Sequence, residues 1–356
     1  MMKITFVIDS LQHGGAERVI TNLARGLSTL GHEISILVLS AYGNCSFYKI
    51  KDDVNVSSLL KKKDEKISKI RKIYRLRQVM KKDKDMLYIA FLPHICIYVY
   101  LASLFLKSNY FVSERSDPSR YSKMYKFFLK RAFKKALGSV FQSQQSKRFY
   151  FKNDERKTKI IVNPVHLENI EKVKGEKEKK ILSVGRLMEE KNFPLLIESF
   201  KLFLKEYPEY VLEIFGDGPL KNNLIKLIED IGLKERVLLK GTDPDWHSKC
   251  INYSCYVCSS DYEGMSNSLE EAACMGLPCV STDCPSGGNK ELLNYGEFGI
   301  LVPVGDANEL CHAMVKTIKN SLVYDNMKLL EKCSLEHVSL EWEKFLLDCL
   351  KRNQIQ

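Results

Sequence analysis

Two glutamates eight positions apart carry the strongest chemical signal in the chain. Glu263 lies in the loop expected after a strand at residues 255–259, and Glu271 lies in the helix expected at residues 268–275. One carboxylate can accept hydrogen bonds from two hydroxyl groups at once. The pair is therefore suited to hold a sugar and a ribose, whereas the same segment standing alone would be read as a capping acid beside an exposed helical acid.

Two cations lie in a loop that leads into another expected helix. Arg186 and Lys191 follow a strand at residues 181–184 and precede a helix at residues 193–207. Fixed cations beside a helix N-terminus can neutralise a diphosphate leaving group without a metal ion. A surface loop with two solvated cations is the competing interpretation, and the spacing alone favours it.

Glycine turns follow other expected strands. Gly216 follows a strand at residues 210–215, residues 283–291 form a glycine loop that enters a helix, and Gly15 begins the first helix of the chain. Because glycine has no Cβ, the backbone at such turns can approach a ligand closely. The N–H groups at the start of a helix also attract anionic oxygens. Each turn taken alone is equally consistent with an ordinary tight turn.

Polar residues also follow strands in the first half of the chain. His94 comes after a strand at residues 87–91, and Glu114 and Arg115 come after a strand at residues 110–113. Ligands of open α/β sheets bind outside the carboxyl ends of the strands, so these three residues are candidates for an acceptor side of the site. A lone histidine is more often structural than catalytic, and its place after a strand makes the two interpretations about equal.

The elements that must position these residues form two successive α/β patterns. Apolar runs such as residues 4–8 are typical of parallel strands buried on both faces, and after a stretch rich in Lys and Glu the pattern restarts at residue 181. We predict two Rossmann-like parallel-sheet domains that face each other across a cleft. The expected division is residues 1–165, a linker at 166–180, a second domain at 181–340 and a C-terminal helix at 341–356.

Charge and hydropathy narrow the class of protein. The net charge is +11, with twelve Lys or Arg against three acids in residues 61–84 and seven against none in residues 120–135. A solvated helix face and an anionic membrane surface explain this about equally well. Nucleic acid is the weakest explanation, because no nucleic-acid-binding signature accompanies the charge. The apolar residues 87–106 are interrupted by Pro93 and His94, which favours a strand, a turn and a helix over a membrane span.

The cysteines and the N-terminal residues suggest a compartment. Eleven cysteines and no small-residue cleavage site behind the N-terminus indicate a reducing cytoplasm. Cys255 and Cys258 have a metal-like spacing, but in a strand they point to opposite faces. We therefore expect no metal site there.

Four motifs in order resemble those of the family 4 retaining glycosyltransferases, which have the two-domain GT-B fold. They are the glycine turn at residues 14–18, the segments 184–192 and 216–219, and the Glu-x7-Glu signature at 263–271. The resemblance covers nearly the whole chain, and the last motif is specific when the others precede it.

The resemblance implies roles for individual residues. Arg186 and Lys191 would hold the donor diphosphate, Glu263 the donor sugar and Glu271 the ribose. The remaining donor-binding positions implied are Gly15, Gly216, Ser266, Asn267, Ser268 and Leu269. No metal ion and no cofactor other than the donor are expected.

One position departs from the family pattern. Many members have a histidine where this chain has Glu114 and Arg115, and an arginine cannot act as a base near neutral pH. Retention can nevertheless proceed on one face of the sugar, with the leaving phosphate oxygen taking the acceptor proton. Whether a residue of the first domain acts as a base stays open.

The sequences of residues 114–118, 263–268 and 283–288 most resemble those of one bacterial branch of the family, which builds surface polysaccharides and lipid-linked glycans. That resemblance implies a UDP-hexose or UDP-N-acetylhexosamine donor and a glycan acceptor on a polyprenyl diphosphate. It also implies a peripheral place at the inner face of the plasma membrane, where residues 67–79 and 120–135 would suit an anionic surface. The alternatives are a non-catalytic nucleotide-sugar-binding module and a nucleotide-sugar epimerase of the same fold.

Overall fold

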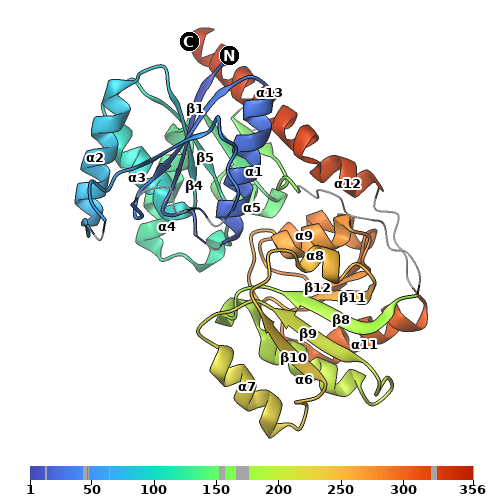
Figure 1. Ribbon diagram of the computed structural model, residues 1–356. Coiled ribbons are helices and arrows are strands. Elements are labelled where there is room, and N and C mark those ends of the chain that lie inside the picture. The colour runs from blue at the N-terminus through green and yellow to red at the C-terminus, as the bar shows by residue number, and fades with distance from the viewer. Residues whose placement is uncertain are drawn as a thin grey trace. The chain divides into compact units, whose positions relative to one another are not determined.

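The computed structural model describes residues 1–12, 14–42, 46, 48–63, 65–151, 157–165, 176–321 and 327–355. The chain forms two compact units, Met1–His166 with Ser334–Gln356, and Leu167–Cys333 (Figure 1). The last helix, α13, spans Leu335–Ile355, so it begins six residues before the expected residue 341 and belongs to the first unit. Residues 166–175 of the expected linker lie outside the described residues, and strand β8 begins at Glu178.

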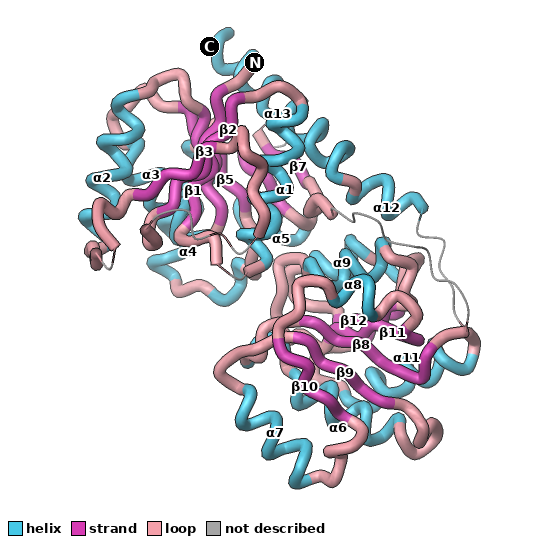
Figure 2. Tube along the Cα trace, in the orientation of Figure 1, coloured by secondary structure: helices cyan, strands magenta, loops and turns pink. Residues whose placement is uncertain are grey.

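The first unit is built on one parallel sheet. Its strands run in the order β3-β2-β1-β4-β5-β6-β7, and every pairing is parallel. The strands are β1 (Lys3–Ile8), β2 (Glu33–Val38), β3 (Asn55–Ser58), β4 (Leu87–Phe91), β5 (Asn109–Ser113), β6 (Gly138–Phe141) and β7 (Thr158–Ile160). Helices cover both faces, which explains why the central strands are continuous apolar runs rather than alternating ones (Figure 2).

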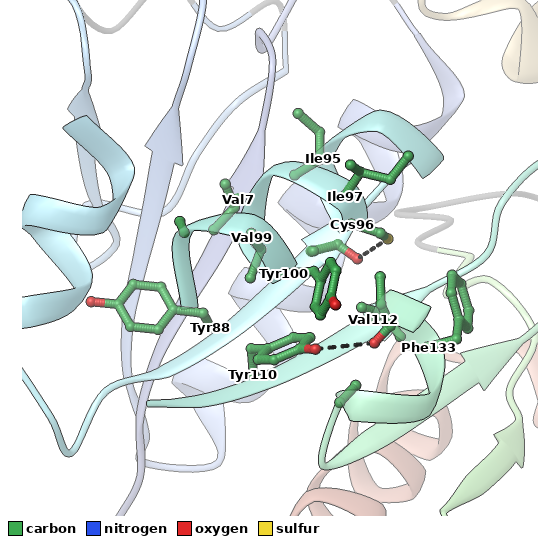
Figure 3. Close-up of a cluster of buried hydrophobic side chains, with 14 of the residues drawn as sticks. Val7, Tyr88, Ile95, Cys96, Ile97, Val99, Tyr100, Tyr110, Val112 and Phe133 are labelled. Carbon is green, nitrogen blue, oxygen red and sulfur yellow. Dashed lines mark hydrogen bonds between the residues drawn. The ribbon is translucent and has the colours of Figure 1, made fainter. Parts of the chain in front are cut away.

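Two layers of helices cover this sheet. The helices are α1 (Gly15–Thr29), α2 (Lys69–Lys82), α3 (Pro93–Ser103), the 3₁₀ turn η1 (Pro118–Arg120), α4 (Lys123–Lys135), α5 (Gln144–Tyr150) and α13. One core joins α2, α3 and α4 to the side chains of Tyr88 and Val112 (Figure 3). On the other face Trp342 of α13 stacks on Phe91, with ring centroids 6.0 Å apart.

The apolar segment at residues 87–106 is strand β4 followed by helix α3. The prediction of a strand, a turn and a helix is confirmed. Among the residues that the structure describes, no helix combines the length and the hydropathy needed to cross a bilayer.

The second unit repeats the architecture. Its sheet has the order β10-β9-β8-β11-β12-β13, again all parallel. The strands are β8 (Glu178–Val184), β9 (Val211–Phe215), β10 (Val237–Gly241), β11 (Tyr253–Cys258), β12 (Cys279–Thr282) and β13 (Ile300–Val302). The helical elements are η2 (Glu189–Lys191), α6 (Phe193–Phe203), α7 (Lys221–Asp230), α8 (Trp246–Lys249), α9 (Asn267–Cys274), α10 (Gly288–Leu292), η3 (Asn294–Gly296), α11 (Ala307–Lys319) and α12 (Met327–Cys333).

Each sheet has one point where the strand order reverses. It lies between β1 and β4 in the first unit and between β8 and β11 in the second. Loops on either side of such a point leave the sheet in opposite directions and open a crevice at the carboxyl ends of the strands, where ligands of this architecture bind. The predicted pair of Rossmann-like parallel-sheet domains is confirmed.

Candidate active site

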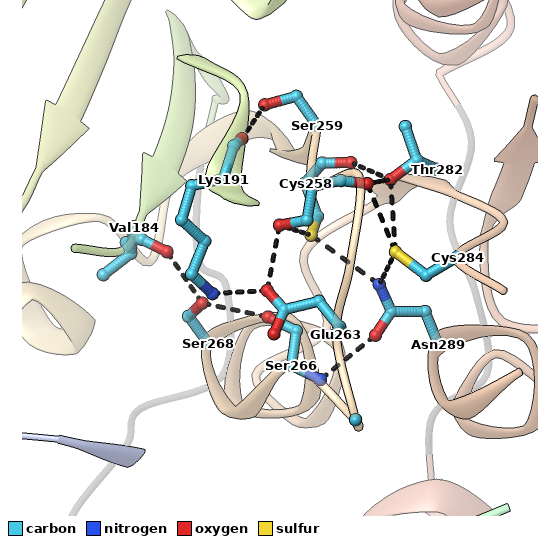
Figure 4. A network of polar contacts seen from close by, with 12 residues as sticks. Val184, Lys191, Cys258, Ser259, Glu263, Ser266, Ser268, Thr282, Cys284 and Asn289 are labelled. Atoms are coloured by element: carbon cyan, nitrogen blue, oxygen red, sulfur yellow. Dashed lines mark hydrogen bonds and ion pairs between the residues drawn. The ribbon is translucent and has the colours of Figure 1, made fainter. Parts of the chain in front are cut away.

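An ion pair joins the two loops at the strand reversal of the second unit. Lys191 follows β8 and Glu263 follows β11, and Nζ of Lys191 donates to Oε1 of Glu263 (Figure 4). Ser260 Oγ donates to the same oxygen at 2.9 Å. The two charged side chains are 19% and 12% exposed, so both remain within reach of a ligand. Oε2 of Glu263 accepts no hydrogen bond from a residue that the structure describes.

The turn before α6 holds Lys191 in this position. Asn192 adopts a left-handed backbone with φ 43°, which asparagine tolerates better than most residues, and its side chain caps α6. Asn192 Nδ2 donates to Asp261 Oδ1 at 2.8 Å, and Ser259 Oγ donates to the Lys191 carbonyl at 2.9 Å. The two loops are therefore tied together on both sides of the ion pair.

Lys191 stays protonated in this setting. Burial lowers its pKa, but the negative charge of Glu263 and the hydrogen bond to it outweigh burial, so the pKa lies above its ordinary value. An ammonium group has three N–H donors, and one of them is taken by Glu263. The lysine therefore keeps donors for an anionic oxygen.

Arg186 lies in the loop after β8, as predicted, but with an exposed side chain. The Arg186 side chain forms no ion pair or hydrogen bond with any residue in the described part of the chain. The structure thus brings Lys191 and Glu263 into contact and leaves Arg186 apart from them.

Gly216 has a packing role that the sequence analysis did not anticipate. Its φ is +140°, and a Cβ at this position would lie 1.9 Å from the carbonyl oxygen of Gly185. The glycine therefore lets the loop after β9 pack directly on the loop after β8. Its role in donor binding stays a prediction.

Side chains hold the start of α9 against the sheet. Ser266 N donates to Asn289 Oδ1 at 3.0 Å, and Ser268 Oγ donates to the Val184 carbonyl at 2.8 Å. Asn267 begins the helix, and Leu269 is fully buried. The first N–H groups of α9 thus occupy a fixed position beside the loop that carries Glu263 (Figure 4). The sequence analysis gave Asn289 no role of its own, because nothing local distinguishes it from a loop amide.

Glu271, in α9, pairs with a histidine of the short helix α8. Its Oε2 lies 2.9 Å from Nε2 of His247, and both residues are buried. The ring of His247 stacks on Trp246 with centroids 3.9 Å apart. Glu263 and Glu271 are predicted to act on one donor, but within the protein they contact different residues, Lys191 and His247. No motif in the sequence around residue 247 predicts a role for His247.

His94 and Glu114 belong to different clusters in the first unit. His94 Nε2 lies 3.0 Å from Oδ2 of Asp9, a residue that the sequence analysis did not consider although it directly follows β1. Glu114 is buried, and Tyr150 OH donates to its Oε2. Burial raises the pKa of Glu114 to about 7 even though hydrogen bonds from Tyr150 and two backbone N–H groups oppose the shift.

Arg115 and Gly15 are the last two of the predicted site residues. Arg115 Nε donates to Ser113 Oγ at 2.8 Å, and its guanidinium lies over the ring of Phe91 at 4.8 Å, so it packs against the sheet. Gly15 begins α1 as expected. Throughout the described ranges, no three His, Cys, Asp or Glu side chains gather as they would to bind a metal ion.

Two family models match the two halves of the chain. The model described as Glycosyltransferase Family 4 matches residues 13–169, and the model described as Glycosyl transferases group 1 matches residues 167–334. Together the two models cover residues 13–334, and the chain belongs to the glycosyltransferases that they describe.

Relatives and solved structures agree with that membership. The glycosyltransferase is 27% identical to the GalNAc-alpha-(1->4)-GalNAc-alpha-(1->3)-diNAcBac-PP-undecaprenol alpha-1,4-N-acetyl-D-galactosaminyltransferase of Campylobacter jejuni, over 98% of this chain and 99% of the relative. It is 29% identical to the N-acetylgalactosamine-N,N'-diacetylbacillosaminyl-diphospho-undecaprenol 4-alpha-N-acetylgalactosaminyltransferase of the same species, over 92% of each chain. A crystal structure of a variant of S. aureus TarM, in complex with Fondaparinux, alpha-GlcNAc-glycerol and UDP, superposes with a TM-score of 0.75 at 15% identity, covering 99% of both chains. That likeness shows the GT-B fold.

Proposed function

We propose that this glycosyltransferase moves a hexose or an N-acetylhexosamine from a UDP-sugar to a glycan carried on a lipid diphosphate, with retention at the anomeric carbon. The observation that carries the proposal is the pair of Lys191 and Glu263 across the strand reversal of the second unit, with Oε2 of Glu263 left for a ligand. A protonated lysine beside an accessible carboxylate oxygen suits a donor that has a diphosphate at one end and hydroxyl groups at the other.

The proposed roles follow from the charges and the contacts. Lys191 donates its remaining N–H bonds to the departing diphosphate, and the exposed Arg186 on the same loop adds a second cation. Glu263 accepts a hydrogen bond from a hydroxyl of the donor sugar through Oε2. Glu271, whose Oε2 lies 2.9 Å from His247 Nε2, accepts a hydrogen bond from the ribose. The donors are positioned before the reaction, which is how fixed charges lower a barrier most effectively.

The remaining donor contacts are made by backbone. The N–H groups of residues 267–269, at the start of α9, bind oxygens of the diphosphate and the sugar, because the helix N-terminus carries a partial positive charge. Ser266, whose own N–H donates to Asn289 Oδ1, orients them. We also propose Gly15, which begins α1, as a donor-binding residue. With Lys191 and Arg186 as cations, neutralisation of the leaving group requires no metal ion.

The names of the two Campylobacter relatives support retention and the acceptor class. Both specify an alpha-linked N-acetylgalactosamine and an acceptor on a diphospho-undecaprenol. UDP-hexosamines carry the sugar through an α bond, so an α product means retention. In a one-faced mechanism the leaving phosphate oxygen takes the proton of the attacking hydroxyl, and the protein supplies charge and position.

The first unit offers a surface for the membrane that would carry such an acceptor. Helix α3 packs against both α2 and α4. Exposed apolar side chains lie on the basic helices α2 and α4 and just after α3, and they are Ile70 (80% exposed), Tyr74 (61%), Phe105 (100%), Met124 (72%) and Phe127 (51%). Apolar side chains among Lys and Arg are the pattern of helices that lie in the interface of an anionic bilayer. We place the enzyme peripherally at the inner face of the cytoplasmic membrane.

A donor screen tests the proposal. The purified enzyme is mixed with single UDP-, GDP- and ADP-sugars, with and without a lipid-linked glycan acceptor and with and without EDTA. We expect acceptor-dependent release of UDP from one UDP-sugar, unchanged by EDTA, and an α linkage in the product by NMR. A β linkage would exclude retention, and inhibition by EDTA would exclude metal independence. Donor epimerisation without an acceptor would identify an epimerase, and UDP binding without cleavage would identify a binding module.

A further inference from the structure

A second close contact between two titratable side chains, an aspartate and a histidine, lies across the strand reversal of the first unit. Asp9 directly follows β1, and His94 follows β4, the neighbouring strand at which the order reverses. The distance from His94 Nε2 to Asp9 Oδ2 is 3.0 Å. Lys191 and Glu263 occupy the corresponding place in the second unit. Because this place is where such sheets bind ligands, the pair in the first unit is a candidate subsite of its own.

Three donors converge on the carboxylate of Asp9. Besides His94, Ser40 Oγ donates to Oδ1, and Lys72 Nζ, which reaches the same oxygen from α2, lies 3.3 Å away. The hydrogen bond from His94, the one from Ser40 and the positive charge of Lys72 outweigh burial and hold the pKa of Asp9 well below its ordinary value. An ionised carboxylate can only accept hydrogen bonds, so Nε2 of His94 must carry the proton.

The other ring nitrogen of His94 is available. Nδ1 makes no hydrogen bond with any residue in the described ranges, and the side chain is 35% exposed. In a neutral imidazole with its proton on Nε2, Nδ1 carries a lone pair and accepts a hydrogen bond. Tyr98 packs edge-on against the ring, with centroids 5.9 Å apart, and with Asp9 it restricts the ring's rotation.

We propose that Nδ1 of His94 accepts a hydrogen bond from a hydroxyl of the acceptor sugar, and that Asp9 is the positioning residue that keeps the lone pair on Nδ1. The inference rests on the proposed function, since it assigns the acceptor to the strand reversal of the first unit and the donor to that of the second. It names a hydroxylated sugar as the ligand because the Asp9 carboxylate already has three donors, so the remaining hydrogen-bond acceptor, Nδ1 of His94, suits a neutral O–H group.

Kinetics of two variants test the assignment. In Asp9→Asn the amide N–H₂ can donate to Nε2, which moves the ring proton to Nδ1 and removes the acceptor; in His94→Gln the imidazole is gone. We expect each variant to lower kcat/KM for the acceptor by about 10-fold to 100-fold, the range of one hydrogen bond to a buried polar group. The double variant should lose no more than His94→Gln alone, because both changes remove the same interaction.

Asp53→Asn is the matched control. Asp53 also pairs with a serine and a lysine, Ser28 and Lys51, but it precedes β3 and so lies at the amino edge of the same sheet. This variant should keep the wild-type kcat/KM. Equal behaviour of Asp9→Asn and Asp53→Asn, or losses that multiply in the double variant of Asp9 and His94, would overturn the assignment.

A measurement without turnover separates this inference from the proposed function. Nitrogen-15 NMR of the histidine rings should show the proton of His94 on Nε2 in the wild type and on Nδ1 in Asp9→Asn. Methyl α-N-acetylgalactosaminide should shift the Nδ1 signal of the wild type but not that of Asp9→Asn. A proton on Nδ1 in the wild type, or no shift with the sugar, overturns the inference. An enzyme that cleaves no donor at all would instead overturn the proposed function.

Discussion

Lys191 and Glu263 are 72 positions apart in the chain, yet their side chains form an ion pair across the strand reversal of the second unit. The pair is neutral as a whole and mostly buried. A ligand that meets both residues therefore meets one cation and one carboxylate oxygen already fixed in place. Each charge also compensates the other, so the two residues affect stability as well as activity.

Substitution of the two partners separates these effects. Lys191→Met leaves the Glu263 charge mostly buried without its cation, so we expect a lower Tm together with a loss of transfer on the order of 10²–10³-fold. The double variant Lys191→Met with Glu263→Gln should regain much of the Tm but none of the turnover. Thermal unfolding and UDP release measure the two outcomes.

Lys221→Met is the control for this experiment. Lys221 also pairs with an acid, Asp217, but both side chains are exposed, and such pairs contribute little to stability. Wild-type turnover in Lys191→Met or in the double variant would exclude the proposed role of the pair.

Gly216→Ala should disrupt the packing of two loops of the second unit. The added Cβ would lie 1.9 Å from the Gly185 carbonyl oxygen, so the loops after β8 and β9 would have to separate. Gly232→Ala is the comparison, since Gly232 also has a positive φ, of +75°, but nothing within 4 Å of the added atom. We expect Gly232→Ala to cost about 1 kcal/mol from backbone strain alone, and Gly216→Ala to lower the Tm further and weaken UDP binding. Equal Tm values would show that the close approach is not needed.

Glu114 predicts a pH dependence of stability. Burial raises its pKa in the folded chain from an ordinary 4.5 to about 7, so the folded state binds the proton more tightly than the unfolded state. The contribution of Glu114 to the free energy of unfolding is fully present below about pH 4.5 and is lost as the pH rises through about 7. At about 1.4 kcal/mol per pH unit, the stability lost over this interval is roughly 3 kcal/mol.

Glu114→Gln should flatten this dependence. The difference in unfolding free energy between the wild type and Glu114→Gln, measured by urea unfolding at several pH values, should shrink or reverse in favour of the variant between pH 4.5 and 7 and stay constant above about pH 7. A difference that grows in favour of the wild type over that interval would mean that Glu114 is ionised in the folded chain.

Membrane binding should depend on the exposed face of α4. Removing two charges with Lys130→Gln and Lys134→Gln should weaken binding to phosphatidylglycerol vesicles roughly 30-fold, at about 1 kcal/mol per basic residue near an anionic surface. Phe127→Ser should weaken it by removing an exposed apolar side chain, whereas Ile225→Ser, at a similarly exposed site on α7, should not. Co-sedimentation measures both. Equal binding to phosphatidylcholine vesicles, or equal effects of the two serine variants, would contradict this surface.

The sequence by itself determined the type of architecture and most of its elements. Continuous apolar runs predicted parallel strands buried on both faces, and β4 has the predicted bounds, Leu87–Phe91. Motifs after the strands predicted Lys191, Glu263 and Glu271 as candidate site residues. These features are readable because strand burial, helix periodicity and turn chemistry depend on neighbours a few positions away. The short strand β13 was not predicted, since three residues carry too little periodicity.

Only the tertiary structure decided which side chains meet. Asp9 meets His94 across 85 positions of the chain, and His247 meets Glu271 across 24. The order of the strands in each sheet brings them together, and no local pattern encodes that order. The same reason explains why α13 belongs to the first unit although it ends the chain: Trp342 buries its ring against Phe91 of β4. Apolar burial selects such a partner by shape and area rather than by distance along the chain.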